Sequence, residues 1–200
     1  MKTLFAFLFA ALIITPALAQ SGYSVGDQAR GFTLKSVDNS MVSLSDYTGK
    51  NGVIVIFTCN HCPYAKAYEQ RIIDIDKKYK PLGYPVVAIN PNDPDRVPED
   101  SYASMQNRSK EKGYPFPYLL DETQEIAKAY GAVKTPHVYL ITPQNGKWIV
   151  QYIGAIDDSP MDANSVHEKY LEDAIHALIN GEKPDPNKTM TVGCTIKWKM

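Results

Sequence analysis

The chain has 200 residues, of which 44% are hydrophobic and 22% charged, and its formal net charge at pH 7 is −1. Such a balance provides no broad positive field, which argues against nucleic acid and against an anionic membrane surface as a partner. Three cysteines are too few to staple a chain of this length, and a chain of this length can bury a substantial core without disulfides. The composition therefore favours a protein or small-molecule substrate and a chemical role for the cysteines.

The beginning of the chain has the pattern of a secretory signal peptide. Lys2 precedes the apolar run 4–14, and Pro16 is followed by the small-residue pattern Ala-Leu-Ala at 17–19. An uncleaved membrane anchor needs roughly 20 apolar residues in a row, and Pro16 breaks this run. We predict a signal peptide over residues 1–19 and a single domain over residues 20–200. The protein is then exported, to the periplasm or as a secreted protein, with no stable membrane insertion after cleavage.

The next part of the chain predicts a β-hairpin and then a buried strand. The segments 32–37 and 41–44 flank the turn-prone residues 38–40, which indicates a hairpin. The run 53–57, Val-Ile-Val-Ile-Phe, is apolar throughout. Continuous apolar strands are typical of the centre of a sheet that helices cover on both faces.

From Pro63 onward, apolar residues recur at spacings of three and four, which predicts an amphipathic helix that Pro81 stops. Pro63 is tolerated in the first turn, where its missing N–H has no partner to lose. The apolar run 85–90 reads as the next strand. Because a long helical crossover leads to it, we expect it to lie parallel to the strand at 53–57.

The second half of the chain continues this alternation and ends in a tail over residues 182–200. The turn 143–147 contains Asn145-Gly146, a strong signal for a hairpin between its flanking strands. The elements expected here are, in chain order, a helix over 99–112, a strand over 118–120, a helix from an N-cap at Asp121 through Tyr130, strands over 137–141 and 148–153, and a helix over 164–180.

A Cys-x-x-Cys motif, Cys59-Asn60-His61-Cys62, lies between the buried strand and the amphipathic helix. Two residues between cysteines bring the sulfurs within disulfide reach when a tight turn enters a helix. The free N–H groups at the helix start favour a thiolate, and His61 between the cysteines adds to this effect. We expect Cys59, the more exposed cysteine, to attack a substrate disulfide, and Cys62 to resolve the mixed disulfide.

The order of elements over residues 26–180 resembles the thioredoxin fold. The resemblance implies an α/β fold with a central mixed β-sheet flanked by helices, here with an N-terminal β-hairpin and a C-terminal extension. Thioredoxin-fold proteins carry a cis-proline that faces the active-site disulfide, and Pro136 after Thr135 matches it. The resemblance thereby assigns Thr135 and Pro136 to substrate binding, with the backbone beside them pairing with a substrate polypeptide.

The stretch 57–64 and the terminal stretch 193–198 resemble a narrower group, the peroxiredoxin-like branch of this superfamily. Its members are the redoxins, or alkyl hydroperoxide reductase/thiol-specific antioxidant proteins, and the chain resembles those that carry a thioredoxin-type Cys-x-x-Cys. Peroxiredoxins use a Pro-x-x-x-Thr-x-x-Cys-Pro motif, which would end here at Cys62 and make it the peroxidatic cysteine. Val55 and Cys59 stand where that motif has its proline and threonine. These replacements argue against a standard peroxiredoxin.

Two differences from thioredoxin affect the site. Thr58 replaces the tryptophan before the first cysteine, and Val53 stands at the position of thioredoxin's buried acid. No local carboxylate base for Cys62 is evident from the sequence. His137 follows Pro136 and either lies across from the disulfide or is an outward-facing strand residue.

Three functions remain open at this point. The first is an exported thiol-disulfide oxidoreductase that acts on protein or small-molecule disulfides and thiols together with a redox partner. The second is a thiol-dependent peroxidase, with Cys194 as the resolving thiol; alternatively, Cys194 is only a small buried hydrophobe. The third is a copper or zinc module that uses Cys59, Cys62 and His137. We expect no cofactor and no resident metal.

Overall fold

The computed structural model describes residues 22–200, so the predicted signal peptide lies outside the described residues. Its main element is a seven-stranded mixed sheet in the order β2-β1-β5-β4-β3-β7-β8. The bounds of its strands are β1 (Thr33–Ser36), β2 (Met41–Ser43), β3 (Val53–Phe57), β4 (Val86–Asn90), β5 (Tyr118–Leu120), β7 (His137–Gln144) and β8 (Lys147–Gly154). A second, two-stranded sheet pairs β6 (Lys134–Thr135) with β9 (Cys194–Thr195).

The strand directions confirm the predicted α/β architecture. β3, β4 and β5 are parallel, β7 runs antiparallel to β3, and the two hairpins β1–β2 and β7–β8 close the sheet at its edges. The first hairpin joins the sheet through β1, which pairs with β5 in antiparallel register. β4 lies parallel to β3, as its helical crossover predicts.

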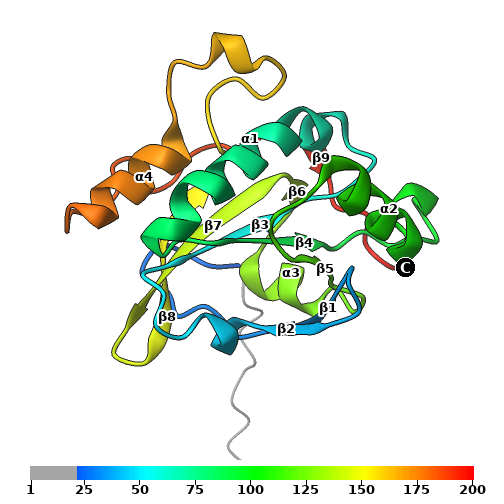
Figure 1. The fold of residues 1–200 in the computed structure, drawn as a ribbon, viewed down its shortest axis with the longest axis horizontal. Helices are drawn as coiled ribbons and strands as arrows, with labels where there is room; N and C mark the ends of the chain where they lie inside the picture. The colour runs from blue at the N-terminus through cyan, green and yellow to red at the C-terminus, as the bar shows by residue number, and fades with distance from the viewer. Residues whose placement is uncertain (1–21) are drawn as a thin grey trace, which may run out of the picture.

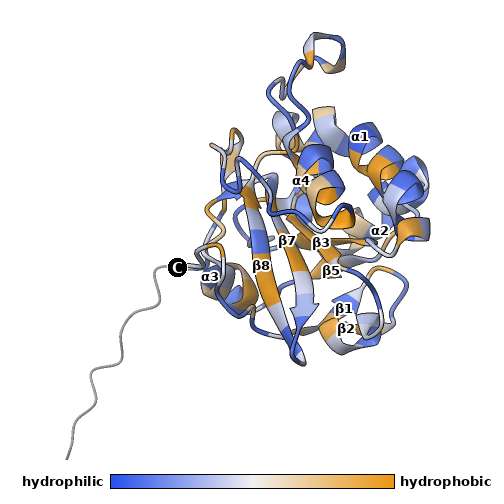
Figure 2. Ribbon diagram, turned by 90° about the vertical axis from the view of Figure 1, so that its left-hand side faces the viewer, coloured by the Kyte–Doolittle hydropathy of each residue, from blue (hydrophilic) through white to orange (hydrophobic). Residues whose placement is uncertain are grey.

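Helices cover both faces of the sheet (Figures 1 and 2). Their bounds are α1 (Pro63–Tyr79), α2 (Tyr102–Lys112), α3 (Glu125–Tyr130) and α4 (Tyr170–Ile179), with 3-10 turns η1 (Leu44–Tyr47), η2 (Lys80–Leu82), η3 (Pro98–Asp100) and η4 (Ala163–Ser165). α1, α2 and α4 contribute to the core on one face, and α3 contributes to the core on the other. Within residues 22–200, no helix is long and apolar enough to cross a membrane.

The central strand β3 explains why both faces must be covered. Ile54 and Ile56 point into the core under α1 and α4, whereas Val53, Val55 and Phe57 point into the core beside α3. All five side chains are buried. Since burying one such side chain contributes roughly 1.5–3 kcal/mol, this strand is a main source of the stability of the sheet. It ends two residues before Cys59, so a fully buried strand leads into the Cys-x-x-Cys turn.

Three predicted helices begin later than expected. The helix expected after an N-cap at Asp121 begins at Glu125 with Gln124 at the N-cap position, although the Asp121 carboxylate accepts from the N–H groups of Ile126 and Ala127. The helix expected from residue 99 begins at Tyr102, because residues 98–100 form the separate turn η3 and Ser101 takes the N-cap position. The helix expected from residue 164 begins at Tyr170. The residues before it form a loop that projects from the body of the protein (Figure 1) and that Arg71 fastens through an ion pair with Asp157 at 2.6 Å.

Candidate active site

The Cys-x-x-Cys motif lies in the turn between β3 and α1. Cys62 is the N-cap residue of α1 and Pro63 is its first residue, as predicted. Cys59 is 3% exposed and Cys62 is fully buried, so Cys59 is the more exposed cysteine, but neither sulfur is open to solvent. Both are free thiols, and the partly exposed Cys194 packs against them. The fold therefore gathers all three cysteines of the chain in one site.

The predicted cis-proline is present at this site. The Thr135-Pro136 peptide bond is cis, and the Thr135 side chain reaches the first cysteine, with 3.1 Å between Thr135 Oγ1 and Cys59 Sγ. The Thr135 carbonyl oxygen lies 3.3 Å from Cys62 Sγ and accepts its hydrogen bond when Cys62 is protonated. Thr135 thus contacts both members of the pair.

Hydrogen bonds divide the single charge of the reduced pair unequally. The contact with Cys59 lowers the pKa of Cys62 to about 4, and the Cys194 side chain and the N–H groups of Ala65 and Cys194 act in the same direction. The contact with Cys62 raises the pKa of Cys59, and burial and the negative charge of Asp100 raise it further. These contacts favour negative charge on Cys62 over negative charge on Cys59.

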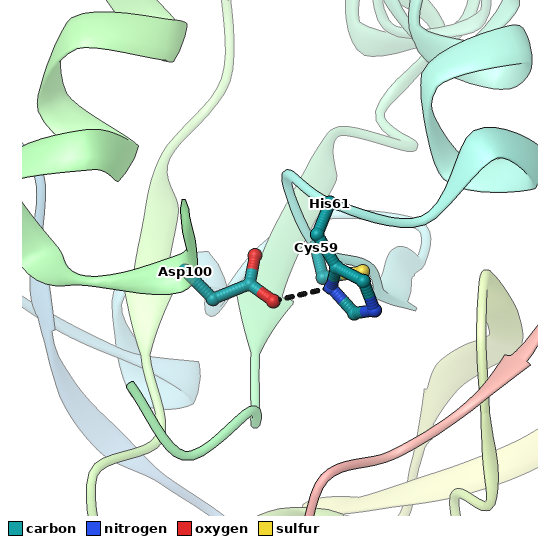
Figure 3. A group of neighbouring side chains, drawn as sticks. All are labelled: Cys59, His61 and Asp100. Carbon is teal, nitrogen blue, oxygen red and sulfur yellow. Dashed lines mark hydrogen bonds and ion pairs between the residues drawn. The ribbon is translucent and has the colours of Figure 1, made fainter. Parts of the chain in front are cut away.

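A buried aspartate that the sequence did not reveal holds the histidine of the motif (Figure 3). Asp100 Oδ2 lies 2.6 Å from His61 Nδ1 and accepts from Asn92 Nδ2 at 2.8 Å. Its other oxygen accepts from the Asn60 N–H at 2.6 Å and from Asn90 Nδ2 at 3.3 Å. Because an ionised carboxylate only accepts, His61 Nδ1 is the donor in this contact, and Nε2 is the ring nitrogen that Asp100 does not hold.

Asp100 also fixes the backbone of the active-site turn. Asn60, between the cysteines, donates its N–H to Asp100 and its side-chain amide to the Glu99 carbonyl at 2.8 Å, and it accepts from Tyr118 Oη at 3.0 Å. A carboxylate therefore serves this site through His61 and Asn60 rather than as a base in contact with Cys62. The acid comes from η3, beyond the carboxyl end of β4, rather than from the strand that carries the cysteines.

The proposed metal ligands are not brought together. Within residues 22–200, the group of three such side chains with ligand atoms inside 4.8 Å of one another is Cys59, His61 and Asp100, which leaves out His137. The four donors that face Asp100 occupy the lone pairs that a cation would need. This arrangement fits a hydrogen-bonded acid–histidine pair, and the hypothesis of a metal site built from Cys59, Cys62 and His137 is not supported.

His137 lies in the interior next to the cis-proline. It is 7% exposed, its ring centroid lies 4.8 Å from that of Tyr139, and its Nδ1 has no hydrogen-bond partner within the described part of the chain. Burial lowers its pKa to about 4, and the charges of Lys188 and Lys134 add to the effect. His137 is therefore a neutral, buried ring, and it does not point away from the protein as one of the two interpretations held.

The fold and the site together define a class. A mixed sheet with a Cys-x-x-Cys turn at the start of α1, and with a cis Thr135-Pro136 bond whose threonine contacts both cysteines, is a thioredoxin-like redox domain. The AhpC/TSA family profile matches residues 25–159, and the chain belongs to this family. Family, fold and paired thiols identify the protein as an oxidoreductase.

Individual relatives agree with this assignment. An uncharacterized conserved protein of Geobacillus kaustophilus has a similar structure, with 39% identity and a TM-score of 0.81 over 92% of this chain and 97% of that one. Thiol-disulfide oxidoreductase ResA of Bacillus subtilis (strain 168) is 29% identical over 68% of this chain and 71% of its own length. Peroxiredoxin Q, chloroplastic, of Triticum aestivum is 30% identical over 56% of this chain and 51% of its own length.

Proposed function

We propose that this protein is an exported thiol-disulfide oxidoreductase that works through a Cys59–Cys62 dithiol-disulfide couple. The observation that carries the proposal is the pair of buried cysteines at the start of α1, with Thr135 in contact with both sulfurs. The similarity to thiol-disulfide oxidoreductase ResA supports it. Its substrates are protein or small-molecule disulfides and thiols, and a separate redox partner resets the couple.

The proton shared by the two thiols gives the order of steps. Cys59 attacks one sulfur of a substrate disulfide while its proton passes to Cys62, and the other substrate sulfur leaves as a thiolate. Cys62 then gives up this proton to the first substrate thiolate and attacks Cys59 Sγ. The mixed disulfide breaks, the Cys59–Cys62 bond forms and the second substrate thiolate leaves. The substrate has gained two electrons and the couple has lost two. In the oxidising direction the same steps run backwards.

His61 handles the proton of the leaving thiol in this proposal. Its Nδ1–H is held by Asp100, so the free Nε2 has a fixed position, and the side chain is 19% exposed beside Cys59. A histidine whose tautomer is fixed by a carboxylate can pass a proton at Nε2 without reorienting. Asp100 acts through His61 and the turn backbone, which makes it a positioning residue.

A trapping experiment tests the proposal. The Cys62→Ser variant lacks the resolving thiol, so it should retain a mixed disulfide at Cys59 with a model disulfide substrate such as 5,5′-dithiobis(2-nitrobenzoate), seen as a mass increase in peptides that contain residue 59. The Cys59→Ser/Cys62→Ser double variant is the matched control and should show no adduct at this turn. If Cys62→Ser forms no adduct at Cys59, and the wild type does not accelerate reduction of insulin disulfides, the proposal is wrong.

One observation favours a second candidate function, a thiol-dependent peroxidase. Hydrogen bonds lower the pKa of Cys62 at a helix N-terminus directly before Pro63, and Cys194 lies against it as a resolving thiol would. The similarity to peroxiredoxin Q supports this reading. Sulfenate formation at Cys62 within seconds of adding micromolar hydrogen peroxide, in a Cys59→Ser/Cys194→Ser variant, would establish it, and a rate no faster than that of a free thiol would remove it.

Export rests on the predicted signal peptide, and it has its own test. Expression of the full chain in a host with an envelope should yield a mature protein that begins at Gln20 and is found outside the cytoplasm. An intact Met1 N-terminus in the cytoplasmic fraction would contradict export and leave the redox chemistry unaffected.

A further inference from the structure

The C-terminal segment crosses the active site as a strap, defined here as residues 187–199. Upstream of Cys194, Thr189 binds the end of β8: its N–H donates to the Ile153 carbonyl at 3.0 Å, and its Oγ1 lies 2.6 Å from Tyr152 Oη. Downstream, Lys197 N–H donates to Asn92 Oδ1 at 2.8 Å, and the Lys197 carbonyl accepts from the Asp93 N–H at 2.9 Å. The strap is therefore fastened on both sides of Cys194.

Two glycines allow the strap to lie this close to the rest of the fold. A Cβ at Gly193 would stand 2.2 Å from the Thr135 carbonyl oxygen, and a Cβ at Gly154 would stand 2.1 Å from Thr189 Oγ1. Both distances are far inside van der Waals contact. The backbone of the strap thus touches the backbone beside the cis-proline, and the sequence provides the space for this contact.

The strap pairs with the strand that carries Thr135, the residue in contact with both sulfurs of the couple. β9 pairs with β6 in antiparallel register, with Thr135 opposite Cys194, and β9 lies beside β6 at the active site (Figure 1). The Cys194 N–H donates to Cys62 Sγ at 3.4 Å, and the Cys194 side chain packs in the same cluster as Cys59 and Cys62. The strap thus places a third thiol directly against the Cys59–Cys62 pair.

We propose that Cys194 is the entry thiol of the enzyme. Cys194 lies on β9 and acts as an internal substrate of the Cys59–Cys62 couple, so that an external dithiol exchanges electrons with the buried pair through Cys194. The proposal deepens the proposed function and rests on it. Cys59 and Cys62 are buried, whereas Cys194 is partly exposed, so Cys194 is the member of the cluster that a partner reaches with the strap in place.

The relay balances with a dithiol as the reductant. The Cys194 thiolate attacks Cys62 Sγ of the oxidised couple; the Cys59–Cys62 bond breaks, the Cys62–Cys194 bond forms, and Cys59 leaves as a thiolate and takes up the proton that Cys194 lost. One thiolate of the external dithiol attacks Cys194 Sγ and releases Cys62. The second external thiol then breaks this mixed disulfide and releases Cys194. The dithiol has become a disulfide, and Cys59 and Cys62 are reduced.

Disulfide mapping tests the central intermediate. In a Cys59→Ser variant oxidised with diamide, we expect a Cys62–Cys194 disulfide, detected by mass spectrometry of peptides prepared without reduction. The matched control is a Cys62→Ser variant, which retains Cys59 and Cys194 and should yield little intramolecular disulfide. Alkylation of both Cys62 and Cys194 after oxidation of the Cys59→Ser variant would overturn the proposal.

A kinetic measurement separates the relay from the proposed function. Reduction of the oxidised wild type by dithiothreitol should slow on the order of tenfold in Cys194→Ser, because an intramolecular thiol has a high effective concentration. Gly193→Ala, which displaces the strap, should slow it as well, whereas Gly31→Ala, whose Cβ meets nothing within 4 Å, should not. Equal rates in the wild type and Cys194→Ser would remove the relay and leave the couple in place. A wild type that forms no Cys59–Cys62 disulfide would instead remove the proposed function.

Discussion

The isosteric substitution Asp100→Asn tests the acid–histidine pair most directly. Asp100 is fully buried, and each of its oxygens accepts from two donors. The amide of asparagine can replace one oxygen by a donor while the shape of the side chain stays the same. Every cost of the substitution is therefore a hydrogen-bonding or charge effect.

The structure determines how the amide is oriented. If its NH2 faced the Asn60 N–H and Asn90 Nδ2, two fixed donors would oppose it, so we expect the NH2 group on the side of His61 and Asn92. His61 can adapt by moving its proton from Nδ1 to Nε2. Asn92 cannot adapt by turning its amide, because its Oδ1 already accepts from the Lys197 N–H at 2.8 Å. One buried donor is left unpaired.

We expect Asp100→Asn to lower the free energy of unfolding by about 2–3 kcal/mol. This is the cost of leaving one buried donor unpaired, together with the weaker hydrogen bonds that an uncharged amide makes with the donors that stay paired. Urea unfolding at pH 7 measures this, with Asp74→Asn on the exposed side of α1 as the matched control, expected within about 0.5 kcal/mol of the wild type. Nitrogen-15 spectra of the His61 ring should show the proton on Nδ1 in the wild type and on Nε2 in the variant. A variant as stable as the control that keeps its Nδ1 proton would refute this account of the site.

Three further predictions concern other parts of the structure. Burial lowers the pKa of His137 to about 4 from an unfolded value near 6.5, so its contribution to the free energy of unfolding is complete above pH 6.5 and is lost as the pH falls toward 4. Urea unfolding should show about 2 kcal/mol less stability from this group at pH 5 than at pH 7. His137→Phe should remove that part of the pH dependence of stability, and an unchanged pH dependence in the variant would contradict the prediction. Thr135→Val removes the hydroxyl that lowers the pKa of Cys59, so exchange at Cys59 with a model disulfide should slow on the order of tenfold in stopped-flow assays, with the exposed Thr33→Val unaffected. Arg71→Leu breaks the ion pair with Asp157 and the hydrogen bonds to the carbonyls of Ser159 and Pro160. Limited proteolysis should therefore cut within residues 158–169 faster than in the wild type. Equal cleavage rates would show that other contacts hold the loop.

Much of the fold was predictable because local patterns and packing agree. The apolar run of β3, the three-and-four spacing of α1 and the Asn-Gly turn between β7 and β8 each predict the element that forms. The late start of α4 was not predictable from periodicity. The apolar stripe that the sequence shows begins before residue 170, but the long-range bond from Arg71 to Asp157 holds the preceding residues in a loop.

Part of the active site could likewise be predicted from the sequence, and part of it could not. Cys59, Cys62 and the cis-proline were accessible from the sequence, because spacing and order alone indicate them. Asp100 was hidden, since it lies in a 3-10 turn that reads as the first turn of a helix. Asn90, the last residue of β4, and Asn92 just after it were the available signal, because the carboxyl ends of neighbouring parallel strands meet at one edge of a sheet.

The contact of Cys194 with the couple depends on a pairing that sequence patterns do not specify. β6 and β9 are two residues long and lie 58 residues apart along the chain, and their register is set by the anchors of the strap on either side. Gly193 was visible in the sequence, but its meaning follows only from its contact with the Thr135 carbonyl.

The central claim, that Cys59 and Cys62 form a reversible two-electron couple, is tested most directly by redox titration. The protein is equilibrated in glutathione buffers of increasing oxidation, quenched with acid, alkylated and mapped by mass spectrometry. The account predicts that Cys59 and Cys62 lose reactivity together, along a two-electron curve, with a disulfide that joins them in the Cys194→Ser variant as well as in the wild type. Separate titration of the two cysteines, or the absence of that disulfide from both proteins at every buffer ratio, would contradict it.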